Sequence, residues 1–158
     1  MLIFTTKLSR KRAVAIILVL AIILCAVVLV AGMRDKKNAK ELAILHGQMI
    51  ETNEDRVKYL GFFGWSVAAE PIDAQEIVIP REFTGVYEEY GRLQDKQGFD
   101  LSSYSGETAT RYTYEILNYP TGESGILADI IICKNTVIAG DIQSPSLNGF
   151  MHGLDINA

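Results

Sequence analysis

The side chains with metal-binding chemistry are few in this chain. It has two histidines, His46 and His152, and two cysteines, Cys25 and Cys133. A zinc site needs three or four nitrogen or sulfur ligands, which this supply does not provide within one domain. Cys25 lies in a long apolar run and Cys133 in a strand-like segment, so a disulfide framework is also excluded. We therefore expect no metal and no cofactor.

A nucleophile and a base can be assembled on paper near the end of the chain. Asp141 and His152 would serve either Ser144 or Cys133, if the fold brought them within hydrogen-bond reach. However, Cys133 ends an apolar strand, where a thiol is usually an inert small hydrophobe. No nucleophile elbow, P-loop, dinucleotide fingerprint or EF-hand loop is present. We expect a protein that is not an enzyme, and an envelope hydrolase remains the alternative.

Aromatic residues are the more distinctive chemical feature. Tyrosine combines a large apolar ring with a polar tip and is therefore common at recognition surfaces. Trp65, the only tryptophan, is expected mainly as a core anchor. The candidate binding residues are Trp65, Tyr90, Tyr104, Tyr112, Tyr114, Asp141 and His152.

The elements that must position these residues follow from local patterns. Thr52 and Asp55 form a capping box for a helix that stops at Gly64. Residues 81–97 form an amphipathic helix whose apolar stripe should pack on a sheet, and Gly98 ends it. Strands are predicted at 75–79, 108–119, 126–133 and 136–142, with the third covered on both faces and a tight turn at 134–135.

These elements describe an α+β domain. Short turns between the later strands favour an antiparallel sheet, and we expect the helices on one face of it. The end of the chain reads as a loop.

The first third of the chain has a different character. Residues 13–32 are apolar without a charge, and twenty helical residues span about 30 Å, the hydrocarbon thickness of a bilayer. The predicted organisation is a basic cytoplasmic tail at 1–12, a transmembrane helix at 13–33, a stalk or linker at 34–51 and an extracytoplasmic α+β domain at 52–158.

Charge bears on orientation and on partners. Four basic residues precede the apolar run, and all 19 acids follow it. A short basic tail before a long apolar run is typical of an uncleaved signal anchor, which keeps the N-terminus in the cytoplasm. Basic residues also follow the run, so the charge count alone leaves the orientation open. The acidic domain excludes nucleic acid as a partner, because phosphate binding needs clustered lysine and arginine.

Two stretches resemble a known family. They are IVIPREFTGVYEEYGRLQDKQGFDLSSYSGETATRYTYEILNYP and AGDIQSPSLNGFMHGL, together with the pair Gly64 and Trp65. They are similar to domain-of-unknown-function family 4830, small single-anchor membrane proteins of Gram-positive bacteria. The resemblance runs from about Arg56 to Leu154, with Gly91 in place of an asparagine and Ala139 in place of a glycine. It implies an anchored domain outside the membrane and no established activity.

The sequence therefore favours a single-pass membrane protein that presents a small binding or sensing module in the cell envelope. Its expected partners are the lipid bilayer, through residues 13–33, and an envelope protein. A structural or assembly protein without a ligand is a second alternative.

Overall fold

The computed structural model of the chain describes residues 19, 20, 22–24, 26 and 47–155. The contacts divide the chain into two units, Met1–Ala43 and Ile44–Ala158. In the first unit the six described residues are helical. Most of the predicted transmembrane helix and stalk lies outside the described residues, and within these no helix is long and apolar enough to cross a membrane.

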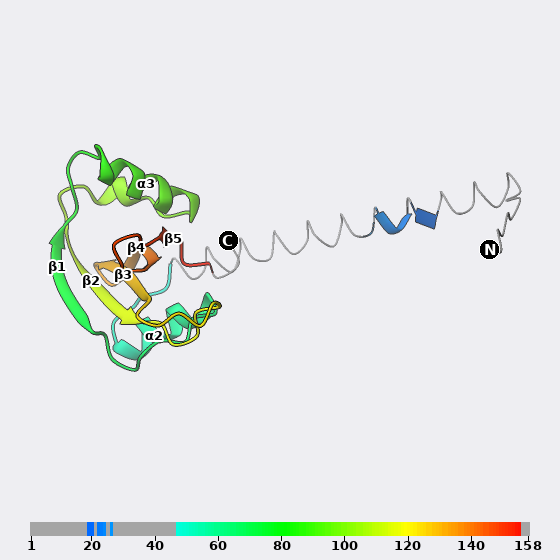
Figure 1. Cartoon of the computed structure of the whole chain (residues 1–158). Helices are drawn as coiled ribbons and strands as arrows, with labels where there is room; N and C mark the ends of the chain where they lie inside the picture. Colours follow the sequence, from blue (N-terminus) through cyan, green and yellow to red (C-terminus); the bar gives the residue numbers. More distant parts are fainter. Residues whose placement is uncertain (1–18, 21, 25, 27–46, 156–158) are drawn as a thin grey trace, which may run out of the picture. The chain divides into compact units, whose positions relative to one another are not determined.

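The second unit is built on one antiparallel sheet with the strand order β1-β2-β3-β4-β5 (Figure 1). The strands are β1 (Asp73–Val78), β2 (Thr108–Glu115), β3 (Leu127–Cys133), β4 (Thr136–Gln143) and β5 (Met151–His152). The predicted α+β class and antiparallel pairing are confirmed. The short strand β5 was expected to be loop; it adds to the sheet by pairing with the end of β4.

The helices begin and end close to their local signals. Helix α2 (Asn53–Phe62) carries the predicted capping box between Thr52 and Asp55. Helix α3 (Val86–Lys96) is shorter than predicted, because Gly85 has a positive φ of 59° and the helix starts only after it. A 3₁₀ turn, η1 (Leu101–Tyr104), follows α3 and is capped by Asp100.

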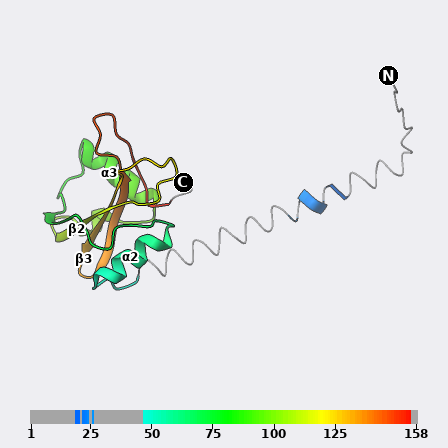
Figure 2. The same ribbon diagram turned by 60° about the horizontal axis from the view of Figure 1, so that its bottom comes forward.

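The two helices lie on opposite faces of the sheet, so the prediction that they share one face is wrong. Figures 1 and 2 show the sheet between α2 and α3. Side chains alternate along a strand, and Tyr114, which contacts α2, and Thr113, which contacts Asp129 on the α3 face, are consecutive in β2. The physical reason is the burial of β3 and β4, whose residues are covered on both sides and need a helix on each.

Two apolar layers result. On the α2 side, Tyr59 and Leu60 of the helix are buried, and so is Tyr114 of β2. On the α3 side, a core cluster gathers around η1, with Phe83, Tyr90 and Tyr104 packed against it. The cluster comprises Ile79, Leu101, Ala109, Ile131, Cys133, Ile138 and Ala139. This cluster fills only part of the space between α3 and the sheet.

Candidate functional site

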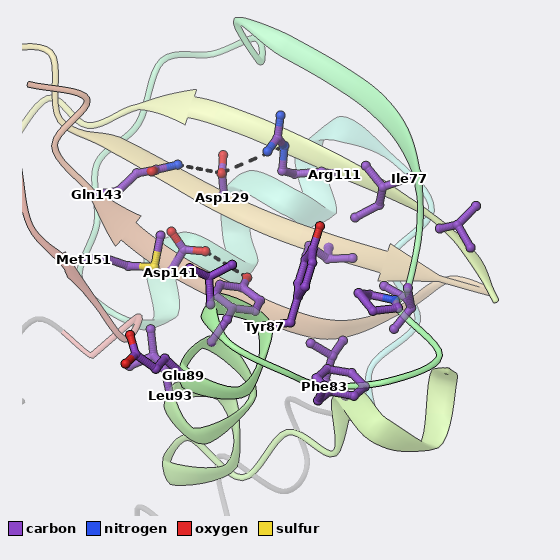
Figure 3. Close-up of a pocket in the computed structure, with 17 residues that line it drawn as sticks. Ile77, Phe83, Tyr87, Glu89, Leu93, Arg111, Asp129, Asp141, Gln143 and Met151 are labelled. Carbon is purple, nitrogen blue, oxygen red and sulfur yellow. Dashed lines mark hydrogen bonds and ion pairs between the residues drawn. The ribbon is translucent and has the colours of Figure 1, made fainter. Parts of the chain in front are cut away.

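A pocket of about 670 Å³ occupies the rest of the space between α3 and the sheet (Figure 3). The predicted apolar stripe of α3 and its approach lines one side: Phe83, Val86, Tyr87, Tyr90 and Leu93. The stripe therefore faces the sheet as predicted. The stripe borders a cavity there, and the first two residues of α3, Val86 and Tyr87, stay exposed to solvent.

The opposite wall carries most of the polar groups of the pocket, while Glu89 lines it from α3. Gln143, Asp129 and Arg111 lie in a row across β4, β3 and β2, and Asp141 lies next to Met151 (Figure 3). The site thus combines a mostly apolar lining with a few convergent charged and polar side chains, which is typical of ligand pockets.

A β-bulge brings the two aspartates together. Lys134 and Asn135 form the predicted two-residue turn, both with positive φ, and a regular hairpin from this turn would pair Asp129 with Gly140. The register shifts between Ile131 and Ile132, so that Asp129 instead pairs with Asp141. Because paired residues in an antiparallel sheet point to the same face, the bulge places both carboxyl groups in the pocket wall.

Asp129 is held by three neighbours on the two flanking strands, β2 and β4. The Thr113 hydroxyl donates a hydrogen bond to Oδ1, and Gln143 Nε2 donates to Oδ2 over 2.8 Å. Arg111 Nε lies 4.0 Å from Oδ2. Burial raises the pKa of Asp129, although the Thr113 bond and the Arg111 charge oppose that shift. Both oxygens of this carboxyl group therefore have protein partners.

Asp141 has only one. The hydroxyl of Tyr90 donates to its Oδ2 over 2.9 Å, while Oδ1 is buried with no hydrogen-bond partner among the residues that the structure describes. The pKa of Asp141 is raised to about 7, mainly by burial and then by the negative charge of Asp129. The hydrogen bond from Tyr90 and the positive charge of Arg111 have smaller effects in the opposite direction. Burial, followed by the negative charge of Asp141, also raises the pKa of Tyr90. The phenol therefore keeps its proton and donates it in the hydrogen bond to Asp141. Near neutral pH, Asp141 can thus exchange a proton with a ligand or accept a hydrogen bond from it.

Two glutamines near the end of α3 fix the helix to β4. Gln94 Oε1 accepts a hydrogen bond from the Gly140 backbone N–H over 3.0 Å, and Gln97 Nε2 donates to the Gly140 carbonyl over 2.9 Å. Gln97 Oε1 also accepts from the Leu154 N–H over 2.6 Å. A substituent on Gly140 would meet the Leu154 side chain at 2.7 Å, so the close approach requires glycine. These hydrogen bonds fix the distance between α3 and the sheet. They thereby also position Tyr90, which lies one helical turn before Gln94 in α3.

Of the predicted binding residues, the structure brings Tyr90 and Asp141 together in this pocket. Tyr104 packs against the core cluster under η1. Tyr112 and Tyr114 point to the other face, where Arg56 lies 4.0 Å above the Tyr112 ring and its Nε donates to the Tyr114 hydroxyl over 2.8 Å. The tyrosines therefore do not line one common groove.

Trp65 and His152 belong to a separate aromatic stack. Trp65 is 3% exposed, as expected of a core anchor, and its Nε1 donates to the Leu154 carbonyl over 2.6 Å. Its ring stacks on Tyr119 at 5.9 Å between centroids, Tyr119 stacks on Phe150, and Phe150 on His152 at 5.6 Å. This stack ties the end of the chain to the segment after α2.

The residues of the alternative hydrolase are spread over the fold. His152 pairs with Ile142, the residue after Asp141, so the two side chains point to opposite faces. The His152 nitrogens instead contact the Tyr119 hydroxyl and the Gly153 carbonyl. Cys133 is buried at the far end of β3. His152 is aligned, through Ile142 of β4, with Ala128 of β3, and Cys133 lies five residues further, about 16 Å along the strand. The Ser144 hydroxyl contacts Ser146.

Sequence reasoning missed four charged or amide-bearing members of the site: Glu89, Arg111, Asp129 and Gln143. One signal was present, because Asp129 is a charged residue inside the otherwise apolar run of β3, and such a residue is rarely buried without a reason. Its alignment with Asp141 depends on the bulge, which has no comparable local signal. Within the part of the chain that the structure describes, no cluster of three or more metal-ligating side chains occurs.

Comparison with known proteins places the chain in one family. The model of a family described as domain of unknown function (DUF4830) matches residues 59–142, a range that runs from α2 to Ile142 in β4 and contains every polar residue of the pocket wall except Gln143. No curated protein and no solved structure matches the chain.

Proposed function

We propose, for a chain that belongs to the DUF4830 family, that it is a binding or sensing module of the cell envelope and that its ligand site is the pocket under α3. In this proposal residues 13–33 anchor the chain in the membrane, with the N-terminus in the cytoplasm and the domain outside. The protein recognises its ligand without transforming it.

The observation that carries the proposal is the contrast between the rim of the pocket and its wall. Val78, Val86 and Tyr87 line the pocket and yet are 65%, 77% and 52% exposed. Apolar side chains that converge on a hollow and remain in contact with water mark interaction sites. Behind them lie buried ionisable groups, of which Asp141 Oδ1 has no hydrogen-bond partner in the described part of the chain. A ligand in the pocket would cover the exposed apolar side chains of the rim and could donate a hydrogen bond to Asp141 Oδ1.

The pocket also has a firm frame. The paired glutamines fix the C-terminal half of α3 to β4, and the core cluster fills the space beside η1. A site whose walls are fixed before binding loses little conformational entropy when the ligand enters. The frame therefore favours specific recognition over a role as an inert spacer.

The anchor rests on the sequence. Twenty apolar residues without a charge match the thickness of a bilayer, and a helix satisfies its own backbone hydrogen bonds there. The basic tail before this run favours a cytoplasmic N-terminus.

One experiment tests both parts of the proposal. Full-length Val86→Cys and Leu117→Cys variants are produced in the membrane of a Gram-positive host and treated with a membrane-impermeant maleimide, in intact cells and in washed membranes. Val86 lies at the pocket rim, and Leu117 is 62% exposed but does not line the pocket, so it is the matched control. The wild-type chain gives the background of its native cysteines.

An envelope ligand in the pocket should slow labelling at position 86 relative to position 117 at least threefold in intact cells, and washing should remove the difference. An equal ratio in both preparations would contradict an occupied pocket. Labelling of both variants only after lysis would place the domain in the cytoplasm and contradict the envelope location.

A further inference from the structure

We infer that the pocket under α3 selects an organic cation, a primary ammonium group on an apolar body, with the ammonium group against Asp141 and the body along the α3 stripe. This inference rests on the proposed function, since it names the ligand class of the same site.

The charges that line the pocket are predominantly negative. They are Glu89 on α3, Asp129 and Asp141 on the sheet, and a single cation, Arg111. Arg111 is engaged within the protein: its Nη2 donates to Gln75 over 2.8 Å and lies 3.8 Å from Asp73 on β1. Its Nε, buried without a hydrogen-bond partner in the described part of the chain, lies 4.0 Å from Asp129 Oδ2. Its charge therefore offsets only part of the negative potential inside the pocket, which favours a positive ligand group.

Hydrogen bonding narrows the position of that group. Asp129 has partners for both of its oxygens, whereas Asp141 has the Tyr90 hydroxyl on Oδ2 and nothing on Oδ1 in the described structure. Asp141 is 2% exposed, and a buried carboxyl oxygen without a donor is costly. An ammonium group brings three donors and a charge to this oxygen, and hydrogen bonds between charged groups are about twice as strong as neutral ones.

The remaining surface argues for an organic cation over a bare metal ion. The apolar residues Ile77, Phe83, Leu93 and Ile131 also line the pocket. Met151 lies beside Asp141 (Figure 3). A hydrated ion would leave this apolar wall uncovered. An aromatic or aliphatic group attached to the ammonium would bury it, with a gain of about 25 cal/mol per Å² of apolar area.

Three matched probes separate the cation from its apolar body: 4-phenylbutylamine, 4-phenylbutanol and 4-phenylbutyrate. Each is tested for protection of the Val86→Cys thiol against the impermeant maleimide in the full-length chain in nanodiscs. Partition of a probe into lipid does not protect this thiol, and Leu117→Cys reports any general effect. The amine should protect at a concentration at least tenfold lower than the alcohol, and the butyrate should not protect.

Variants locate the charge that is responsible. In the Val86→Cys background, Asp141→Asn should abolish the tenfold advantage of the amine over the alcohol. Asp95→Asn, an exposed position on α3 outside the pocket, removes one charge of the same sign and should leave the advantage unchanged. Emission of Trp65 verifies that each variant is folded.

Two sources of such a cation are distinguished by a further pair of probes, phenylalanyl-leucine amide and its N-acetylated form. Protection by the free peptide alone would assign the ammonium group to a peptide N-terminus, and protection by 4-phenylbutylamine alone would assign it to a small amine. Equal protection by amine and alcohol would overturn the cation inference and leave the pocket as a ligand site. If none of the probes protects the thiol at position 86, the inference is overturned. The proposed function is tested independently by the ratio of labelling at positions 86 and 117 in intact cells.

Discussion

Neutralising Asp141 should remove a large part of the pH dependence of folding. The pKa of this carboxyl rises from 3.8 to about 7 on folding, first because of burial and then because of Asp129. Between these two values the folded chain keeps a proton that the unfolded chain has released, so the free energy of unfolding falls as the pH rises. The stabilisation is complete below about pH 4 and lost above about pH 7. At about 1.4 kcal/mol per unit, the loss is about 4 kcal/mol over the whole interval.

The assay is urea unfolding of the full-length chain in detergent at pH 5, 6, 7 and 8, followed by the emission of the single, buried tryptophan. Between pH 5 and 7 the wild-type chain should lose about 2.3 kcal/mol more than Asp141→Asn. With a slope of about 1.5 kcal/mol per molar urea, its midpoint should fall by about 1.5 M more. Asp95→Asn controls for the removal of a surface charge and should follow the wild-type chain.

The comparison between variants is needed because other carboxyl groups titrate in the opposite sense. Hydrogen bonds to backbone and hydroxyl groups lower the pKa of Asp55 and of Asp100, so their contributions are lost as the pH falls. These contributions are common to the wild-type chain and to Asp141→Asn and cancel in the difference. Parallel pH curves for the two proteins would refute the reasoning, since Asp141 would then titrate as an ordinary exposed carboxyl.

Three further substitutions test the frame of the pocket by the same unfolding assay. Gln97→Ala should cost about 2 to 3 kcal/mol, because it leaves the buried N–H of Leu154 and the carbonyl of Gly140 without partners. Gly140→Ala should cost about 1 to 3 kcal/mol, because its methyl group would lie 2.7 Å from Leu154 Cδ1 and 3.1 Å from the Asp129 carbonyl. Gly61→Ala, in the last turn of α2 with open space around it, should instead stabilise the domain by about 0.4 to 1 kcal/mol, because alanine reduces the conformational entropy of the unfolded chain. A neutral Gln97→Ala would contradict the role of the glutamine pair, and equal effects at the two glycines would contradict the close approach at Gly140.

Features with a local cause could be predicted from the sequence. The capping box of α2 needs only Thr52 and Asp55, three residues apart, and the structure confirms both of its hydrogen bonds. The two-residue turn at Lys134 and Asn135 also follows from the short spacing of two strand patterns, although a lysine with positive φ is unusual.

Features that depend on long-range packing were missed or wrong. The start of α3 was predicted too early, because the pattern of apolar residues does not reveal the backbone turn at Gly85. The placement of both helices on one face conflicted with the prediction that β3 is covered on both faces, and the packing of β3 decided the outcome. Strand β5 has only two residues and forms through pairing with β4, which no local pattern of that length reveals.

The site shows the same division. Tyr90 and Asp141 were identified from their residue types, and the structure joins them by a hydrogen bond. Asp129 was missed because its position opposite Asp141 depends on one extra residue in β4, which moves every later side chain of that strand relative to β3. His152 was grouped with Asp141 because they lie close in the sequence, yet the strand pairing sends the two side chains to opposite faces.

The most direct test of the ligand site is the carbon-13 resonance of the Asp141 carboxyl group in the full-length chain, assigned by its loss in Asp141→Asn. It is titrated from pH 4 to 9 alone, with saturating 4-phenylbutylamine and with 4-phenylbutanol. A bound ammonium group stabilises the ionised carboxylate, so the amine should lower the pKa of Asp141 from about 7 by at least one unit, and the alcohol should not. A titration curve that stays the same in saturating amine would contradict the account.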